Sequence, residues 1–134
     1  NSIAPGKRPL CNICPVVVSR AGQPWFCIGA SGGRRIVPAV TQLSLMMIDR
    51  GLDVETAFHQ PRVDVSGVGP IRVNRTLSDA VKKAIAAKQP IVEVDAQIAP
   101  LGFANPSCIV RDPKTGELTG MNEVMAPWAG GAAQ

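Results

Sequence analysis

The residues with the clearest chemical potential lie at a glycine-rich junction in the first quarter of the chain. The sequence Gly29-Ala-Ser-Gly32-Gly33-Arg-Arg-Ile36 joins a strand-like segment to a helix-like one. Glycine has no Cβ atom, so other groups can approach its backbone closely, and amides at a helix start have no intrahelical acceptor. The amides of Gly32 and Gly33 are therefore suited to an oxyanion hole, which donates hydrogen bonds to charge developing on an attacked carbonyl.

Two other interpretations of this junction stay open. The same amides, with Arg34 and Arg35 beside them, also suit a phosphate group. The Gly-Lys-Ser/Thr ending of a P-loop is missing, however. A tight turn that only lets the helix pack closely on the sheet would need glycines here as well. Local sequence does not decide between these interpretations.

A second candidate is the turn-rich stretch Pro5-Gly-Lys-Arg-Pro-Leu-Cys-Asn-Ile-Cys-Pro15, which leads directly into an apolar strand. Loops in such positions often carry binding groups. Cys11 can offer a weak thiol donor to a substrate, and Asn12 can offer its side-chain amide. Alternatively, Asn12 caps the turn while Cys11 and Cys14 pack as small apolar side chains.

Cys11 and Cys14 also form a CxxC pair, which is typical of redox motifs and of half a zinc site. Zinc takes four ligands, but Cys27 and Cys108 stand alone in strand-like runs and His59 is the only histidine. A redox CxxC needs a helix N-terminus to lower its thiol pKa, whereas a proline and three valines follow here. We therefore expect no metal and no cofactor, and a thiol-redox or metal module is the weakest hypothesis.

Length and composition suit one domain spanning residues 1–134, with 46% hydrophobic and 18% charged residues. No apolar run reaches the roughly 18 residues that cross a bilayer, and the N-terminus carries no signal peptide. The net charge of +4 comes from scattered Lys and Arg without interleaved aromatics, so no nucleic-acid binding is expected. The cysteines lean weakly towards the cytoplasm, and a periplasmic or extracellular location stays open.

Hydrophobic periodicity predicts the elements that hold these residues in place. Strands over 15–19 and 25–29 form a hairpin around the turn 20–23, and a small-residue turn over 30–33 follows. A helix then begins, with Pro38 in its first turn and Gly51 ending it as a C′ residue. The later pattern predicts a helix over 54–59 capped by Asp53, a strand over 71–73, a helix opened by a Thr76-Leu-Ser-Asp79 capping box, a strand over 91–94, and a hairpin of strands 107–111 and 117–121 around an Asp112-Pro-Lys-Thr-Gly116 turn. This order indicates an α/β or α+β chain with antiparallel pairs at both ends.

Several of these segments resemble sequence blocks of the γ-glutamyltransferase family. Gly6-Lys-Arg-Pro-Leu-Cys-Asn-Ile-Cys-Pro15 is similar to the family's Gly-Lys-Arg-Pro-Leu-Ser-Ser-Met-Ser/Thr-Pro. The junction from Gly29 to Ile36 is similar to its Gly-Ser-Pro-Gly-Gly-Ser-Arg-Ile. Downstream, Asp49-Arg-Gly-Leu-Asp-Val-Glu-Thr-Ala57 and Gln60-Pro-Arg62 look like its Asp-x-Gly-x-Asn-Val-x-x-Ala and Ala-Pro-Arg. The blocks are collinear and cover nearly the whole chain.

The resemblance implies part of an N-terminal-nucleophile hydrolase, an αββα sandwich of antiparallel sheets flanked by helices. In such a protein the precursor cleaves itself, and the new N-terminal Thr of the small subunit attacks an amide with its own α-amino group as base. By this resemblance the chain is the C-terminal part of the small subunit, and the Thr lies on a segment before Asn1. The implied partners are the rest of the small subunit, the large subunit and a small-molecule amide substrate.

At the level of residues, the resemblance assigns the oxyanion hole to Gly32 and Gly33, in agreement with the independent interpretation of the junction. Cys11 and Asn12 occupy the positions of two serines that hold the substrate's α-carboxylate in γ-glutamyl-specific members. Because both differ, amide cleavage is better supported than γ-glutamyl specificity. The alternatives are small amides of the oxamate type or acylase side chains as substrates, and a catalytically inactive structural homologue. The segment Gly120-Met-Asn-Glu-Val-Met also departs from the family's Gly-Ala-Ser-Asp-Pro-Arg.

Overall fold

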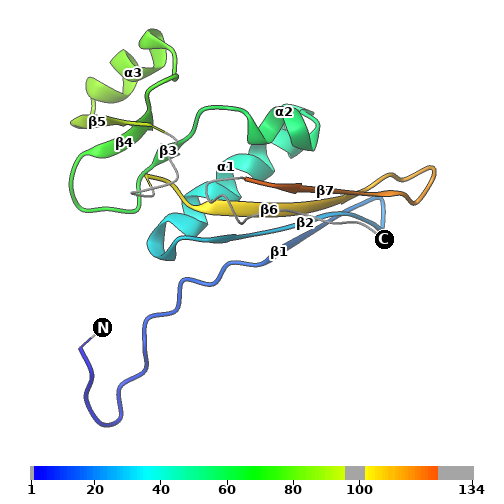
Figure 1. Ribbon diagram of the computed structural model, residues 1–134, viewed down its shortest axis with the longest axis horizontal. Coiled ribbons are helices and arrows are strands. Elements are labelled where there is room, and N and C mark those ends of the chain that lie inside the picture. Colours follow the sequence, from blue (N-terminus) through cyan, green and yellow to red (C-terminus); the bar gives the residue numbers. More distant parts are fainter. Residues whose placement is uncertain (1, 96–101, 124–134) are drawn as a thin grey trace.

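In the computed structural model, which describes residues 2–95 and 102–123, a four-stranded antiparallel sheet carries two helices on one face (Figure 1). The strands, in their order across the sheet, are β1 (Val16–Arg20), β2 (Gln23–Ser31), β6 (Asn105–Arg111) and β7 (Leu118–Asn122). The helices are α1 (Ile36–Ile48) and α2 (Val54–Phe58). The expected α+β class, with antiparallel pairs at both ends of the chain, is confirmed.

The hairpin of β1 and β2 turns through Ala21 and Gly22, whose φ angles are 51° and 76°. Two positive φ values in a two-residue loop match the twist of the flanking strands. At its other end β2 continues to Ser31, two residues beyond the predicted strand, because Ala30 and Ser31 pair with β6. The turn before α1 is therefore shorter than predicted and centres on Gly32 and Gly33.

Helix α1 follows a 3₁₀ turn over Gly33–Arg35. Pro38 is its third residue, so the prediction that this proline lies in the first turn is confirmed, and its missing N–H removes no intrahelical bond. After the helix, Gly51 has a φ of 66° and the Leu52 amide donates to the Met46 carbonyl. Asp49 is the C-cap, so Arg50 is the C′ residue. Gly51, which was predicted as C′, lies one residue further along.

Helix α2 begins as predicted at Asp53, whose carboxylate accepts the Thr56 amide at 2.8 Å and the Thr56 hydroxyl at 2.7 Å. The Thr56 amide holds the pKa of Asp53 below its ordinary value. The predicted turn at the other end of the molecule is confirmed in the same way. Asp112 accepts the amides of Thr115 and Lys114 there, and these bonds lower its pKa.

A second, smaller sheet contains β3 (Val63–Asp64), β4 (Ile71–Asn74) and β5 (Ile91–Val94). Strand β3 was not predicted. It is antiparallel to β4, whereas β4 and β5 are parallel and are joined through α3 (Asp79–Ala86), so the expectation of antiparallel sheets does not hold for this pair. Parallel strands need a crossover of this kind.

The predicted N-cap of α3 at Thr76 is wrong, because the helix begins after Ser78. The side-chain oxygen of Asn74 accepts both the Thr76 amide, at 2.9 Å, and the Thr76 hydroxyl, at 2.8 Å. This local turn occupies the groups that would have capped a helix.

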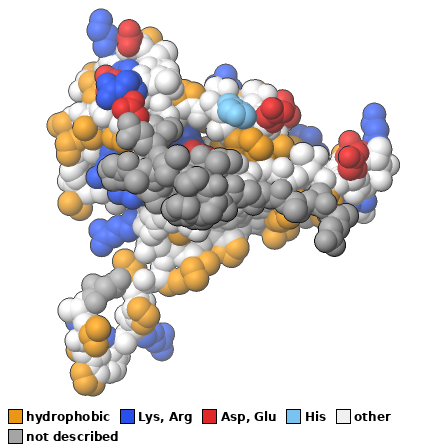
Figure 2. Space-filling model, in the orientation of Figure 1, with side chains coloured by type: hydrophobic (Ala, Val, Ile, Leu, Met, Phe, Trp, Pro, Cys, Tyr) orange, Lys and Arg blue, Asp and Glu red, His pale blue; other side chains and the backbone are white. Residues whose placement is uncertain are grey.

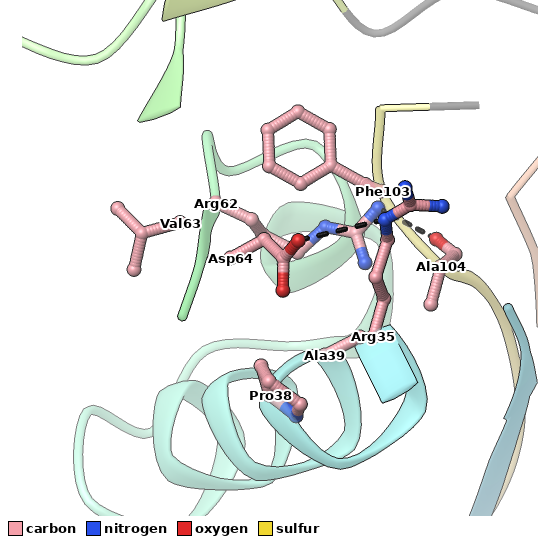
Figure 3. A pocket seen from close by; sticks show the side chains of 8 residues that line it. All are labelled: Arg35, Pro38, Ala39, Arg62, Val63, Asp64, Phe103 and Ala104. Carbon is pink, nitrogen blue, oxygen red and sulfur yellow. Dashed lines mark hydrogen bonds and ion pairs between the residues drawn. The ribbon is translucent and has the colours of Figure 1, made fainter. Parts of the chain in front are cut away.

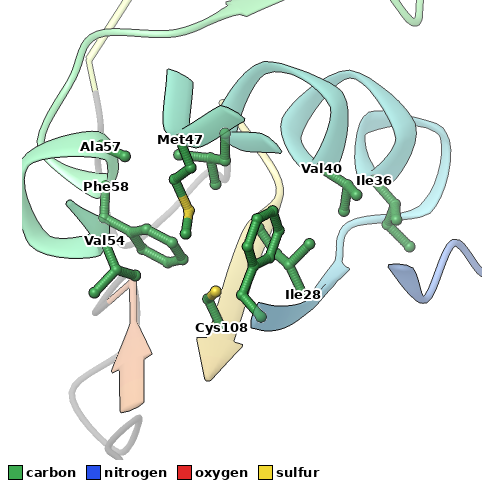
Figure 4. Close-up of a cluster of buried hydrophobic side chains, with 10 residues drawn as sticks. Ile28, Ile36, Val40, Met47, Val54, Ala57, Phe58 and Cys108 are labelled. Carbon is green, nitrogen blue, oxygen red and sulfur yellow. The ribbon is translucent and has the colours of Figure 1, made fainter. Parts of the chain in front are cut away.

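The hydrophobic core lies between the large sheet and its two helices (Figure 4). The sheet contributes inward-facing side chains of β2 and β6, and the helices contribute their apolar faces. Its buried members are Phe26, Ile28, Ile36, Val40, Leu43, Met47, Val54, Ala57, Phe58 and Cys108. On α1 these buried residues recur every three or four positions, at Ile36, Val40, Leu43 and Met47, which is the spacing of one helix face. The tail after Trp128, whose small residues predict a frayed end, lies outside the described residues.

The opposite face of the large sheet is uncovered within residues 2–95 and 102–123. Val17, Cys27 and Ile109 lie in one row across β1, β2 and β6, and all three are exposed, Val17 to 74%. Figure 2 shows hydrophobic side chains along this side of the molecule, away from the helices. None of the helices in the described part of the chain is both long and apolar enough to cross a membrane.

Candidate oxyanion site

The turn between β2 and α1 has a backbone that only glycine adopts readily. Gly32 has a φ of 145° and Gly33 a φ of 60°, both in the region that side chains disfavour. At Gly32 space is limiting as well, because a Cβ atom there would lie 2.8 Å from the Cα atom of Ala104. The two glycines are thus required by conformation at both positions and by packing at Gly32.

The amides of this turn are the candidate donors. In the described part of the chain, neither the Gly32 nor the Gly33 amide has a recorded acceptor, whereas the Gly32 carbonyl accepts the Arg35 amide at 3.3 Å. A Cβ atom on Gly33 would meet nothing within 4 Å, so the space in front of that residue is open. Two neighbouring amides without an acceptor in the described ranges, at a strand-to-helix bend that is open on the Gly33 side, are candidate donors of an oxyanion hole.

Cys11 and Asn12 lie in the extended segment that precedes β1 (Figure 1). Cys11 is exposed and Asn12 is partly buried. Strand β1 begins at Val16, which pairs with Ile28 three residues before the end of β2. The recorded pairing ends at Val16, so the segment and the glycine turn share one end of the sheet without a ladder between them.

All four cysteines are free thiols. Burial raises the pKa of the Cys108 thiol to about 12, so this residue is inert and belongs to the core. Across residues 2–95 and 102–123, no group of three or more His, Cys, Asp or Glu side chains is arranged to hold a metal ion. The hypothesis of a metal module built on Cys11 and Cys14 has no geometric support in this range.

The buried carboxylate of Asp64 contacts Arg35 of the 3₁₀ turn. Asp64 is only 3% exposed, and its Oδ2 atom lies 3.5 Å from the Nε atom of Arg35 and 3.5 Å from Nη1 of Arg72. Its Oδ1 atom accepts the Ser66 amide. Asp64 itself is held in place because Gln42 of α1 makes two hydrogen bonds to the backbone of neighbouring Val63. This cluster connects the glycine turn to β3.

A second buried charge lies beside the first (Figure 3). Arg62 is 4% exposed, its Nη2 atom donates to the Ala104 carbonyl at 3.2 Å, and it forms an ion pair with Glu123. Its guanidinium also lies 5.6 Å from the ring centroid of Phe103. Burial raises the pKa of Glu123, and the Arg62 guanidinium offsets part of that rise.

The crevice lined by Arg35, Arg62, Asp64 and Ala104 has no room for a water molecule. An open groove of about 590 Å³ lies on the other side of Arg62, between α2, β4 and the end of β7. None of Gly32, Gly33, Cys11 and Asn12 lines that larger groove. The glycine turn stays the candidate site, because backbone amides at such a bend have a defined chemistry.

Sequence reasoning missed the residues that support the turn. Arg62 falls within the family-like block Gln60-Pro-Arg62, whereas no motif marks Asp64, Ala104 or Glu123 individually. One signal was present, since an arginine and an aspartate two positions apart flank a valine between helix α2 and strand β4. Charged side chains are almost never fully buried unless they are paired, so a buried Arg62 or Asp64 needs partners. The sequence does not show which residues these partners are, because they lie far away along the chain.

Comparison with known proteins agrees with this architecture. A family model described as gamma-glutamyltranspeptidase matches residues 1–132. The glutathione hydrolase proenzyme of Escherichia coli is 35% identical over 89 residues, covering 66% of this chain and 15% of the relative. The acylase ACY 1 proenzyme of a Pseudomonas species is 32% identical over 87 residues, covering 65% of this chain and 15% of the relative.

Among solved structures, the T380A mutant of the Helicobacter pylori gamma-glutamyltranspeptidase has a TM-score of 0.78 at 23% identity. That match covers 92% of this chain and 66% of the other, and it shows a shared fold. The chain spans only about 15% of the length of the E. coli and Pseudomonas proenzymes. Because the family model matches residues 1–132 of the 134, this chain belongs to the γ-glutamyltranspeptidase family.

Proposed function

We propose that this chain supplies the oxyanion hole of an amide hydrolase or acyltransferase whose nucleophile is an N-terminal Thr on another segment of the same precursor. The observation that carries the proposal is the turn at Gly32 and Gly33, whose amides have no recorded acceptor in the described ranges and whose Gly33 side faces open space. Membership of a family that contains glutathione hydrolase and acylase proenzymes supports amide cleavage as the reaction.

The chemistry follows from these groups. The Thr hydroxyl attacks the carbonyl carbon of the substrate amide while its own α-amino group takes the hydroxyl proton. The carbonyl oxygen becomes an oxyanion and accepts hydrogen bonds from the two glycine amides. The C–N bond then breaks, the amino group returns the proton to the leaving amine, and an acyl-enzyme ester remains. Water releases the acid in hydrolysis, whereas an amine gives a new amide in transpeptidation.

Selection of the acyl group is the finer part of the proposal. Cys11 and Asn12 lie at the same end of the sheet as the glycine turn, in a segment that β1 connects to it. An Asn amide can still donate to a substrate carboxylate, while a thiol is a poor donor. γ-Glutamyl amides such as glutathione are therefore the first substrates to test, and oxamate-type amides or acylase side chains are the alternative.

The partners we propose are the remainder of the small subunit and the large subunit. The exposed apolar row of Val17, Cys27 and Ile109 on the open face of the sheet supports a second sheet packing there. Two sheets pack face to face at a spacing of about 10 Å, with such residues interdigitating. In the assembled protein, Cys27 should then resist iodoacetamide until the protein is unfolded. An exposed control, Thr115→Cys in the turn between β6 and β7, should react at once.

The proposed function is tested on the complete protein that carries this chain. Intact mass and N-terminal sequencing of everything that co-purifies should identify a polypeptide beginning with Thr. The complex should release p-nitroaniline from an acyl p-nitroanilide, and replacing that Thr with Ala should abolish release. A complex with no Thr-initiated chain and no amide turnover would instead favour a structural homologue.

A further inference from the structure

We propose that Arg62, held by Glu123, is a positioning residue that fixes the glycine turn through the carbonyl of Ala104. This inference rests on the proposed function, because it concerns the same oxyanion site. It adds a residue that does not touch the reacting atoms and acts through a backbone contact.

The first step is the anchoring of Arg62. Its side chain is 4% exposed and lies between the end of α2 and the start of β6, where it reaches Ala104 and Glu123, 42 and 61 positions away in the sequence (Figure 3). A guanidinium that donates to a carboxylate and a carbonyl from a single Nη atom has its plane fixed by both partners. Arg62 therefore ties together three separate parts of the chain.

The second step is the contact between Ala104 and Gly32. Ala104 is 1% exposed, and a Cβ atom on Gly32 would lie 2.8 Å from its Cα atom and 2.9 Å from its Cβ atom. The crevice that Ala104 lines with Arg35 and Arg62 has no room for a water molecule, so these side chains lie close together. Because closely packed atoms transmit small shifts, the position of the Ala104 carbonyl sets the position of the Gly32 backbone.

The third step is the choice of a charged pair for this task. An apolar side chain would fill the same volume without the desolvation penalty of a buried ion pair. A hydrogen-bonded pair instead defines a direction, since Nη2 of Arg62 must point at the Ala104 carbonyl. In the same crevice, Asp64 lies 3.5 Å from Arg35, which follows the two glycines in the 3₁₀ turn, so the turn has a second contact on its C-terminal side.

The test uses Glu123→Gln and Arg62→Lys in the complete, processed protein, with rates normalised to the processed fraction measured by mass spectrometry. The amide of Glu123→Gln keeps the volume and loses the charge, while the lysine of Arg62→Lys keeps the charge and loses the planar fork. For both variants kcat should fall by about tenfold to a hundredfold, because a displaced donor weakens only the interaction made in the transition state. KM should change by less than about twofold.

A matched control is Arg75→Gln, which removes an ion pair between an exposed arginine and Asp95 and should leave kcat unchanged. The positioning role would be overturned if the processed variants keep kcat within about twofold, or if their only change is a higher KM. Gly33→Ala, measured in parallel, separates the two proposals. If Gly33→Ala retains full turnover, the oxyanion assignment itself fails. If it loses turnover while both pair variants keep it, only the role of Arg62 fails.

Discussion

Ala104 lies directly against the backbone of Gly32, so closely that a Cβ atom on Gly32 would come within 2.8 Å of its Cα atom and 2.9 Å of its Cβ atom. Gly32 also has a φ of 145°, which an L side chain rarely adopts. Gly33, its neighbour, has a left-handed φ of 60° but faces open space. The two glycines of one turn are thus required for different reasons, and they respond differently to substitution.

Gly32→Ala should reduce both stability and turnover. The new methyl group would overlap Ala104, and the adjoining crevice has no room for a water molecule, so we expect the turn to shift and the donor amides to move. We expect kcat to fall by about 10²-fold or more, as when an oxyanion donor is removed. The melting temperature should fall in the same variant, and steady-state kinetics with thermal unfolding measure both effects.

Gly33→Ala should reduce turnover with a smaller loss of stability. An Ala in the left-handed region costs about 1 kcal/mol, and no neighbour clashes with it. Its methyl group projects into the open space where the substrate carbonyl would lie. Gly116→Ala is the matched control, because Gly116 has a φ of 78° in the distant β6–β7 turn. Equal kcat values for Gly33→Ala and Gly116→Ala would contradict the assignment.

The double substitution of Cys11→Ser with Asn12→Ser should raise the kcat/KM for γ-glutamyl anilides. Two hydroxyls replace a weak thiol donor and an amide, and both lie at the sheet end that holds the glycine turn. The gain should appear as a lower KM, because carboxylate binding is shared by ground state and transition state. An unchanged KM would mean that selectivity is set elsewhere.

The main elements could be predicted from the sequence because their signals are local. The spacing of apolar residues revealed α1, Asp53 marked the start of α2, and the Asp112 turn marked the last hairpin. Strand β3 was not predicted because a strand of two residues is too short to show an alternating pattern of apolar residues. The cap of α3 was misplaced because Asn74, two residues upstream, competes for the groups of Thr76.

The candidate site was only partly predictable. The pair Gly32 and Gly33 indicates a backbone with positive φ angles, and this signal is local in the sequence. The supports of the turn depend on pairs distant in sequence, such as Arg62 with Glu123 and Gln42 with the backbone of Val63. A residue pattern cannot show which charge meets which, since the pairing is decided only when the sheet, helices and loops pack together.

The stability of the protein relative to Glu123→Gln should decrease as pH rises. Burial raises the pKa of Glu123 above its ordinary value of 4.5, so the folded protein holds this proton more tightly than the unfolded chain. The resulting stabilisation is fully present below the unfolded pKa and is lost as pH rises through the folded pKa.

Denaturant unfolding of both proteins at a series of pH values from about 4 to 7 measures this difference. The glutamine of Glu123→Gln does not titrate, and all other carboxyls are common to both proteins, so their contributions cancel. A stability difference that grows in favour of the native protein as pH rises would mean that the attraction of Arg62 outweighs burial, contrary to the assigned cause of the shift.

Ala21→Asn should stabilise the protein without affecting catalysis. Ala21 is the one residue other than glycine with a positive φ within residues 2–95 and 102–123, at 51°, in the two-residue turn between β1 and β2. Asn tolerates this conformation better than Ala, and Asn-Gly is the preferred pair for such a turn. The unfolding free energy should rise by about 0.5–1 kcal/mol, which denaturant titration resolves. Ala30→Asn in extended β2 is the control, since no backbone strain is relieved there, and an equal gain in both variants would show that the turn conformation is not the cause.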